Sequence, residues 1–378
     1  MENGYTLYGS YASYYTAKTR SYLRKKGIPF VERLPSDPMF RNKVRPASGS
    51  HRIPQLLTPE GNVIQDSVEI QDYLEVRFPN LPAIPDTPRQ RVFVHLMELM
   101  ASEGLIRLAW LHRWMFEEND SFVKKDFGRS FRPQGSDEDL LKYGNLIAER
   151  MTSYGLPEST PAFTEALDEQ YLQLLSLFEA HLLHHPYFLG GHPSAADYAI
   201  MGAMHAHLGR DPAGLRVMQH NAPRVFRWVE HMIVPEVRSP EFASTPVEYL
   251  AEDVVPETSL AILGYIAREY GGQFVLGAIA FNQAMARLAP SPGYELNPDV
   301  DQPALPPEQV LHEGIEHSHA ANLHGLWLTQ RAQGYFQSLS KEHRVRVERM
   351  LGAGVATNLI NVPLTTTILR RNNRLVTA

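Results

Sequence analysis

The sequence predicts an α/β domain of about 80 residues, followed by an all-helical domain and a further helical extension. Strand and helix signals alternate over the first eighty residues, and from about Thr87 the apolar spacing changes to that of long helices. Nearly 140 residues follow Pro240. At roughly 150 residues per domain, 378 residues correspond to about 2.5 domains. We expect the three parts to span residues 1–82, 88–238 and 239–378.

The α/β part is predicted from short β-rich runs and clear stop signals. Gly27 ends the first helix, and Pro29 forbids its continuation. The first two strands, joined by that helix, should be parallel with a right-handed crossover. The last two, separated by a short turn, should form an antiparallel hairpin. The expected strands are residues 5–8, 29–33, 54–57 and 63–64, and the expected helices are residues 13–26 and 67–77.

The remaining helices are predicted from apolar faces. The run from Tyr198 to Met204 is apolar nearly all round, which is typical of a central buried helix. Ser194 and Asp197 have the spacing of a capping box at its start. The stretch from Pro290 to Pro307 is proline-rich and should be a loop. The expected helices are residues 91–116, 165–184, 194–208, 223–232, 256–270, 273–288, 319–336 and 340–351. We expect the extension to pack against the helical domain, because its segments have apolar faces and are not low-complexity.

Composition excludes several classes of protein. The 36 basic and 42 acidic residues give a net charge of −6, which argues against a nucleic-acid-binding protein. The chain begins with no signal peptide and has no apolar run of about 18 residues, so we expect a cytoplasmic protein without a membrane partner. The absence of cysteine excludes disulfides, thiolate metal sites and a cysteine nucleophile.

Several segments together resemble glutathione S-transferases, in the order in which that family has them. The matching segments are residues 8–20, 25–30, 52–56, 65–74, 188–197 and 222–232. The resemblance covers residues 5–235 and suggests a serine-type, bacterial-like member with a long C-terminal extension. It implies a thioredoxin-like N-terminal domain, an all-helical second domain, a cytoplasmic homodimer and a role in detoxification.

The resemblance also implies residues that bind glutathione. The family has a cis proline at the position of Pro54, and Ile53 before it would pair its backbone with the cysteinyl part of glutathione. Asp66 would bind the γ-glutamyl ammonium group. Ser67, with the helix N–H groups beside it, would bind the γ-glutamyl carboxylate, and a helix N-terminus suits an anion. Arg52 either meets the glycyl carboxylate or is a solvated surface arginine.

Ser13 matches the family's catalytic serine or cysteine position. A hydroxyl at a helix start can donate to the glutathione thiolate and lower the pKa of that thiol. The family's next residue is proline, whereas this chain has Tyr14, which puts the loop geometry in doubt. Ser10, Tyr11 and Tyr14 remain alternatives for the contact with sulfur, and Ser13 could also be a helix cap without a catalytic role.

The expected reaction uses the thiolate of glutathione as nucleophile toward a small, apolar electrophile. Conjugation, ether cleavage, dehalogenation, isomerisation and peroxide reduction all remain open. Tyr14, Trp110, Arg113 and Trp114 are candidates to line the electrophile pocket, and a packed core or a dimer helix is the alternative role for the three residues of the long helix. A second hypothesis is a non-catalytic glutathione-binding or regulatory protein that keeps the fold.

We expect glutathione as co-substrate and no metal. The histidines of the extension lack the spacing of a metal motif, and we interpret them as surface or satisfied residues; they are His312, His317, His319 and His324. The short basic run from Arg370 to Arg374 is interpreted as a solvated chain end.

Overall fold

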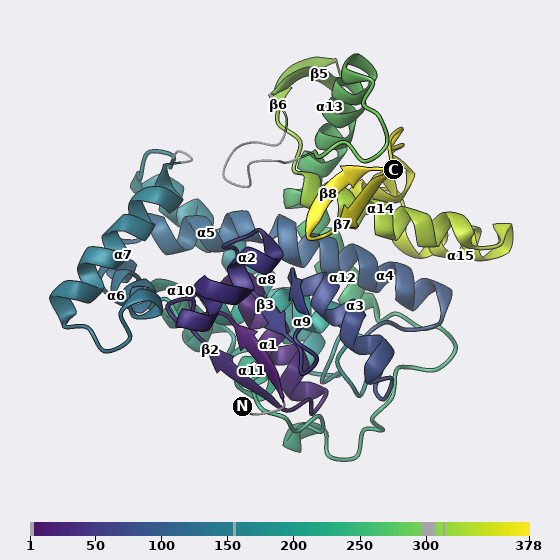
Figure 1. Cartoon of the computed structure of the whole chain (residues 1–378). Helices are drawn as coiled ribbons and strands as arrows, with labels where there is room; N and C mark the ends of the chain where they lie inside the picture. The colour runs from purple at the N-terminus through teal and green to yellow at the C-terminus, as the bar shows by residue number, and fades with distance from the viewer. Residues whose placement is uncertain (1–3, 154–155, 297–304, 306, 313) are drawn as a thin grey trace. The chain divides into compact units, whose positions relative to one another are not determined.

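The computed structural model describes residues 4–153, 156–296, 305, 307–312 and 314–378. Its elements divide into two compact units. Unit 1 contains residues 1–83 and 105–250, and unit 2 contains residues 84–104 and 251–378. Figure 1 labels the elements of both units.

The first part of unit 1 is the predicted α/β layer. Its strands have the order β2-β1-β3-β4, with β1 parallel to β2 and antiparallel to β3, and β3 antiparallel to β4. Both predicted pairings are therefore confirmed. Short elements η1 and α2 fill the irregular stretch before β3. The bounds are β1 (Tyr5–Tyr8), α1 (Tyr14–Lys25), β2 (Phe30–Arg33), η1 (Phe40–Val44), α2 (Arg45–Ser48), β3 (Gln55–Leu57), β4 (Val63–Gln65) and α3 (Ser67–Arg77).

The rest of unit 1 is helical, as predicted. The long helices expected near residues 165–184 and 223–232 are α8 and α11, whereas α6, α7 and α10 were not predicted. The bounds are α5 (Ile106–Met115), η3 (Glu117–Asn119), α6 (Asp120–Phe131), α7 (Asp137–Thr152), α8 (Pro161–Leu182), α9 (Ala195–Met201), η4 (Gly202–His207), α10 (Pro212–Asn221), α11 (Pro223–Met232) and η5 (Pro240–Phe242).

The central helix of unit 1 confirms the prediction from its apolar sequence. Every residue of α9 and of the π-helical segment η4 is buried, and α1 packs along both. The capping box is present at its start: Asp197 accepts from the backbone N–H and from the hydroxyl of Ser194, both at 2.8 Å. Burial raises the pKa of Asp197 to about 6.

Unit 2 contains the extension together with α4. The expected helices near residues 256–270, 273–288 and 340–351 are α12, α13 and α15. The bounds are α4 (Pro88–Leu99), η2 (Met100–Gly104), α12 (Glu257–Tyr270), α13 (Gly272–Leu288), β5 (Glu308–His312), β6 (Ile315–His319), α14 (Leu323–Ser338), α15 (Lys341–Leu351), α16 (Val355–Asn361), β7 (Ile368–Arg371) and β8 (Arg374–Thr377).

The helix α4 groups with the extension because α14 and α15 pack along it (Figure 1). The sequence placed this segment within one helix over residues 91–116 of the helical domain. In the structure a π-helical segment, η2, follows α4, and α5 then begins in unit 1. The three-part division at residues 82, 88 and 238 stays a prediction.

Two β-hairpins in unit 2 differ from the all-helical expectation. The hairpin β5–β6 takes up residues expected at the start of a helix, so α14 begins at Leu323 rather than near residue 319. The basic run from Arg370 to Arg374 spans the end of β7, the turn and the start of β8, so this partly exposed segment is ordered as a hairpin. Asn372 and Asn373 have φ values of 50° and 62°, which is typical of a tight two-residue hairpin turn. Of the proline-rich stretch, residues 297–304 and 306 lie outside the described residues.

Candidate functional site

The register of the sheet in unit 1 brings three loops to one end. Tyr8 of β1 lies opposite Gln55 of β3, and Gln55 lies opposite Gln65 of β4. The loop before α1 leaves directly after Tyr8, Ile53 and Pro54 directly precede Gln55, and Asp66 follows Gln65. Because neighbouring strands are about 4.8 Å apart, these three segments lie side by side at one end of the sheet. The sequence-predicted residues Ser13, Arg52, Ile53, Pro54, Asp66 and Ser67 all lie in or next to these segments.

Ser13 is the N-cap of α1. Its hydroxyl oxygen accepts a hydrogen bond from the backbone N–H of Thr16 at 3.3 Å. Its own backbone N–H donates to the carbonyl of Ser10 at 3.2 Å. The side chain is half-buried, so its O–H remains available as a donor while its oxygen caps the helix.

A buried arginine holds the start of the same loop. Arg20 of α1 has 0% exposure and donates to the carbonyl of Ser10 at 3.1 Å. Its guanidinium also donates to Glu32 at 2.7 Å, and it lies 4.0 Å from the ring centroid of Tyr11. Tyr11 is 44% exposed and covers this guanidinium from outside.

The segment before β3 has the backbone form that the resemblance implies. The Ile53–Pro54 peptide bond is cis. Gln55 braces the preceding turn, since its amide donates to the carbonyls of Ser50 and Arg52, each at 2.8 Å. Pro54 is buried, Ile53 is half-buried and Arg52 is exposed.

The start of α3 places a carboxylate and a hydroxyl together. Asp66 is the N-cap of α3, with a φ of 90°, and its Oδ1 accepts from the N–H groups of Val68 at 2.8 Å and Glu69 at 3.4 Å. Ser67 is only 2% exposed, and its Oγ has no hydrogen-bond partner among the residues that the structure describes. A buried hydroxyl without a partner at a helix N-terminus suits an anionic group brought by a ligand.

The four residues predicted for an electrophile pocket divide into two kinds. Trp110 and Trp114 are half-buried, and the Trp114 ring stacks on Phe127. Tyr14 is 5% exposed and Arg113 is 3% exposed. Burial leaves these last two side chains little surface with which to line a pocket.

Tyr14 packs against the π-helical segment η4. A Cβ added at Gly202 would lie 2.2 Å from Cε1 of Tyr14, so the ring rests directly on the Gly202 backbone. The same ring makes edge contacts with Tyr15 and His207, each at a centroid distance of 5.4 Å. Tyr14 therefore anchors the start of α1 to the central helix.

Two buried histidines near this loop were missed by the sequence reasoning. His205 and His207 of η4 are each 7% exposed, and the ring of His205 makes an edge contact with Tyr11 at 6.3 Å. Burial, helped by the charge of Arg20, lowers the pKa of His205 to about 3. Burial also lowers the pKa of His207. Both rings are thus neutral at pH 7, and the available signal was their position at the end of an otherwise apolar helix.

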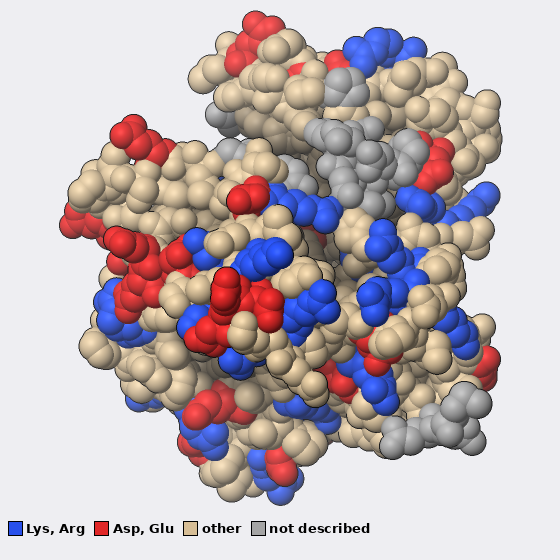
Figure 2. Space-filling view, turned by 60° about the vertical axis from the view of Figure 1, so that its left-hand side comes forward, with Lys and Arg blue, Asp and Glu red and all other residues tan. Residues whose placement is uncertain are grey.

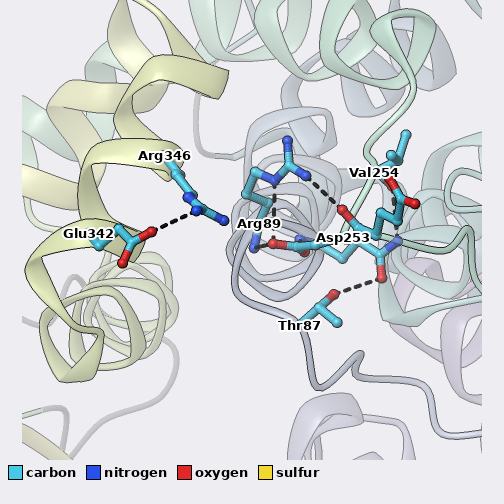
Figure 3. Close-up of polar contacts among 8 residues, drawn as sticks. Thr87, Arg89, Asp253, Val254, Glu342 and Arg346 are labelled. Carbon is cyan, nitrogen blue, oxygen red and sulfur yellow. Dashed lines mark hydrogen bonds and ion pairs between the residues drawn. The ribbon is translucent and has the colours of Figure 1, made fainter.

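Unit 2 has a separate pocket of about 420 Å³. It is lined by Thr87, Pro88, Arg89, Glu252, Asp253, His343 and Arg346. Asp253 accepts from the backbone N–H of Arg89 at 2.9 Å and from its Nε at 3.3 Å, and Arg346 donates to Glu342 at 2.6 Å (Figure 3). The Asp253 carboxylate thus already accepts from the backbone N–H groups of Arg89 and Gln90 at the N-terminus of α4.

The four histidines of the extension belong to unit 2. His312, His317 and His319 belong to hairpin β5–β6, while Nδ1 of His324 lies 2.9 Å from the buried carboxylate of Glu103. In the described part of the chain, no group of three or more candidate ligands is placed to hold a metal ion.

On the face shown in Figure 2, lysine and arginine side chains are interspersed with aspartate and glutamate. Over the residues described, no helix combines the length and apolarity needed to span a membrane.

Unit 1 thus combines a small mixed sheet, a set of helices and three loops gathered at one end of the sheet. Residues 7–82 match the family model of the glutathione S-transferase N-terminal domain, and residues 161–231 match that of the C-terminal domain. The chain therefore carries both domains of the glutathione S-transferase family over these residues. No curated protein matches it significantly.

Solved structures of the family are similar to part of the chain. A glutathione S-transferase from Methylobacterium radiotolerans, in complex with glutathione sulfonate, is 20% identical and covers 67% of this chain and 99% of its own, with a TM-score of 0.36. A glutathione transferase family member from Pseudomonas fluorescens, with two glutathione bound, is 19% identical over 65% and 94%, with a TM-score of 0.37. A β-etherase from Sphingobium is 20% identical over 62% and 96%, with a TM-score of 0.42.

Proposed function

We propose that the chain is a glutathione transferase that binds glutathione at the sheet end where Ser13, Ile53 and Asp66 meet. The observation that carries this proposal is the Ser67 hydroxyl, buried and without a partner among the described residues, beside the N-terminal N–H groups of α3. A γ-glutamyl carboxylate would accept from that hydroxyl, and the Asp66 carboxylate would attract the neighbouring ammonium group. Relatives with glutathione or glutathione sulfonate in their structures support the same ligand.

In this proposal Ser13 is the catalytic residue. Its O–H donates to the glutathione sulfur, which stabilises the thiolate and lowers the pKa of the thiol. The thiol proton passes to solvent, and the sulfur electron pair forms the bond to an electrophilic atom of the second substrate. The leaving group departs with the electron pair of the broken bond. Because the chain contains no cysteine, the sulfur must come from glutathione.

Binding is tested by calorimetric titration with glutathione. We expect Ser67→Ala to weaken glutathione binding about tenfold or more, because it removes a hydrogen bond to a charged group. Ser340→Ala is the matched control, since Ser340 caps the exposed helix α15 through the N–H of His343 and lies in unit 2. Unchanged binding in Ser67→Ala, or absent binding in the wild-type protein, contradicts the proposal.

Catalysis is tested separately with Ser13→Ala. We expect turnover of an aryl halide to fall about a hundredfold or more while glutathione still binds. The alternative, a non-catalytic glutathione-binding protein, is favoured by the bond between Ser13 and the Thr16 N–H, which gives Ser13 a role as a helix cap. Binding without turnover by the wild-type protein, across halides, aryl ethers and hydroperoxides, would favour that alternative.

A two-fold homodimer, as in the family, is the assembly we propose, and light scattering measures it.

A further inference from the structure

Arg113 was predicted to line a substrate pocket, but its surroundings give it another role. The side chain is 3% exposed and its guanidinium reaches three separate segments of unit 1. Nη1 donates to the carbonyl of Ala12 at 2.8 Å, and Nη2 donates to the carbonyl of Ala206 at 2.6 Å. Nε and Nη2 also donate to the two oxygens of Asp211, at 2.7 and 3.1 Å.

The carbonyl of Ala12 belongs to the peptide group that leads into Ser13. A peptide group is planar, so fixing its oxygen also fixes the direction of its N–H and the position of the next Cα. The other side of this group is held as well, because the Ser13 N–H donates to the carbonyl of Ser10. Arg20 binds that same Ser10 carbonyl. The loop before α1 is thus held at Ser10 by one buried guanidinium and at Ala12 by another.

Asp211 is also held through its backbone, since its N–H donates to the carbonyl of His207 at 2.8 Å. It is 3% exposed and directly precedes α10. Asn119 joins the start of α10 to the end of α5: its Oδ1 accepts from the N–H of Ala213 at 2.9 Å, and its Nδ2 donates to the carbonyl of His112 at 2.7 Å. The Arg113–Asp211 pair therefore has a rigid frame against which it can hold the loop.

Stability alone does not account for this pair. Replacing a buried ion pair with apolar side chains of similar volume is often neutral or stabilising. An apolar side chain cannot donate to Ala12, Ala206 and Asp211 at once, whereas the planar fork of arginine can. Since Asp211 neutralises the charge of Arg113, the effect on Ser13 is geometric rather than a long-range attraction for a thiolate.

We propose that Arg113, held by Asp211, is a positioning residue that sets the orientation of Ser13 through the carbonyl of Ala12. This inference rests on the proposed function only in taking Ser13 as the group that meets the glutathione sulfur. It assigns Arg113 no contact with either substrate.

The test uses the full-length double variant Arg113→Met/Asp211→Leu, which removes both charges and leaves no unpaired ion in the interior. Arg113→Lys is the conservative variant, because it keeps the charge but lacks the fork. Arg216→Gln is the matched control, since Arg216 pairs with Glu118 at 3.3 Å on the exposed side of α10.

The first measurement is amide hydrogen exchange over the loop in the absence of glutathione, which is independent of the proposed function. We expect exchange at Ser13 and Thr16 to become about tenfold faster in the double variant and in Arg113→Lys, and to be unchanged in the control. Wild-type exchange rates in both Arg113 variants, with the fold intact by circular dichroism, overturn the inference.

The second measurement is the pKa of the bound thiol, followed by the ultraviolet absorbance of the thiolate during pH titration. In the double variant we expect this pKa to rise by about one to two units, kcat to fall about a hundredfold and glutathione affinity to stay within about threefold. A faster-exchanging loop with an unchanged thiol pKa and kcat also overturns the inference. A wild-type protein that does not bind glutathione refutes the proposed function instead, and hydrogen exchange still decides whether Arg113 holds the loop.

Discussion

The close contact between Gly202 and Tyr14 makes a strong prediction. Gly202 has ordinary helical angles, φ −55° and ψ −54°, so its backbone would accept any residue. An added Cβ would nevertheless lie 2.2 Å from Cε1 and 2.3 Å from Cδ1 of Tyr14. Real contacts of a Cβ stay above 3.0 Å, so the ring must move by roughly an ångström. Tyr14 is also packed against Tyr15 and His207, which limits that movement.

We therefore expect Gly202→Ala to destabilise the protein. Overpacking costs about 1–3 kcal/mol, and the better helix propensity of alanine returns about 1 kcal/mol, so the net loss should be roughly 0–2 kcal/mol. Because Tyr14 follows Ser13 directly, we also expect kcat to fall more than glutathione affinity. Urea denaturation followed by circular dichroism measures the first effect, and steady-state kinetics measures the second.

The control is the same substitution at an open position. Gly264 lies on the exposed face of α12, where an added Cβ meets nothing within 4 Å. Gly264→Ala should stabilise the protein by up to about 1 kcal/mol. If Gly202→Ala were as stable as Gly264→Ala, the packing of Tyr14 on η4 would be refuted.

Three further predictions concern caps and buried charges. Ser194→Ala removes the hydroxyl that donates to the buried carboxylate of Asp197 but keeps the backbone N–H bond, and it should cost about 1–3 kcal/mol by urea denaturation; a loss below about 0.5 kcal/mol contradicts this role. Burial lowers the pKa of His192 to about 4, against 6.5 when unfolded, so the stability it contributes is present above pH 6.5 and is lost as the pH falls toward 4. That contribution is roughly 3 kcal/mol, and the raised pKa of Asp197 changes stability in the opposite direction over this pH range. In His192→Asn the urea midpoint should therefore fall less steeply between pH 6.5 and 4 than in the wild-type protein. An identical slope in the two proteins would contradict this role of His192. Asp253→Ala should cost about 1–2 kcal/mol because it uncaps α4, whereas Asp253→Asn should keep most of the stability; equal losses in the two variants would rule out the capping role.

The α/β layer was predictable because its signals are local. Gly27 and Pro29 end a helix wherever they occur in a chain, and the short turn between the last two strands fixes their pairing. The same holds for the residues at the sheet end. Ser13 and Asp66 are both N-caps, and each is recognisable from its own helix.

The contacts that hold the loop before α1 could not be predicted from the neighbouring sequence. Arg113 and Asp211 are 98 positions apart, and nothing in either neighbourhood in the sequence indicates the partner. Burial also changed the interpretation of Tyr14, since an aromatic residue after a candidate catalytic serine looks like a pocket wall until its packing on Gly202 is known. Hairpin β7–β8 did carry a local signal, because Asn372 and Asn373 stand between two short runs that each contain an apolar pair, Ile368–Leu369 and Leu375–Val376.

Helices α6 and α7 were missed for a different reason. Their sequences are rich in charged residues, and only Val123, Gly128 and Ser130 of α6 and Leu140, Gly144 and Ala148 of α7 are buried. Such a narrow buried face gives only a weak helical spacing of apolar residues in the sequence. The tertiary packing that stabilises these two helices could not be read from that spacing.

The alignment of Tyr8, Gln55 and Gln65 has a consequence for folding as well as for binding. A ligand held at this end of the sheet would touch segments attached to β1, β3 and β4 at once, so its binding energy would be available only when all three strands are in register. A slip of one residue in any strand turns its side chains to the opposite face. Ligand affinity would then report on strand alignment, and excess ligand would stabilise the aligned sheet against thermal unfolding by mass action.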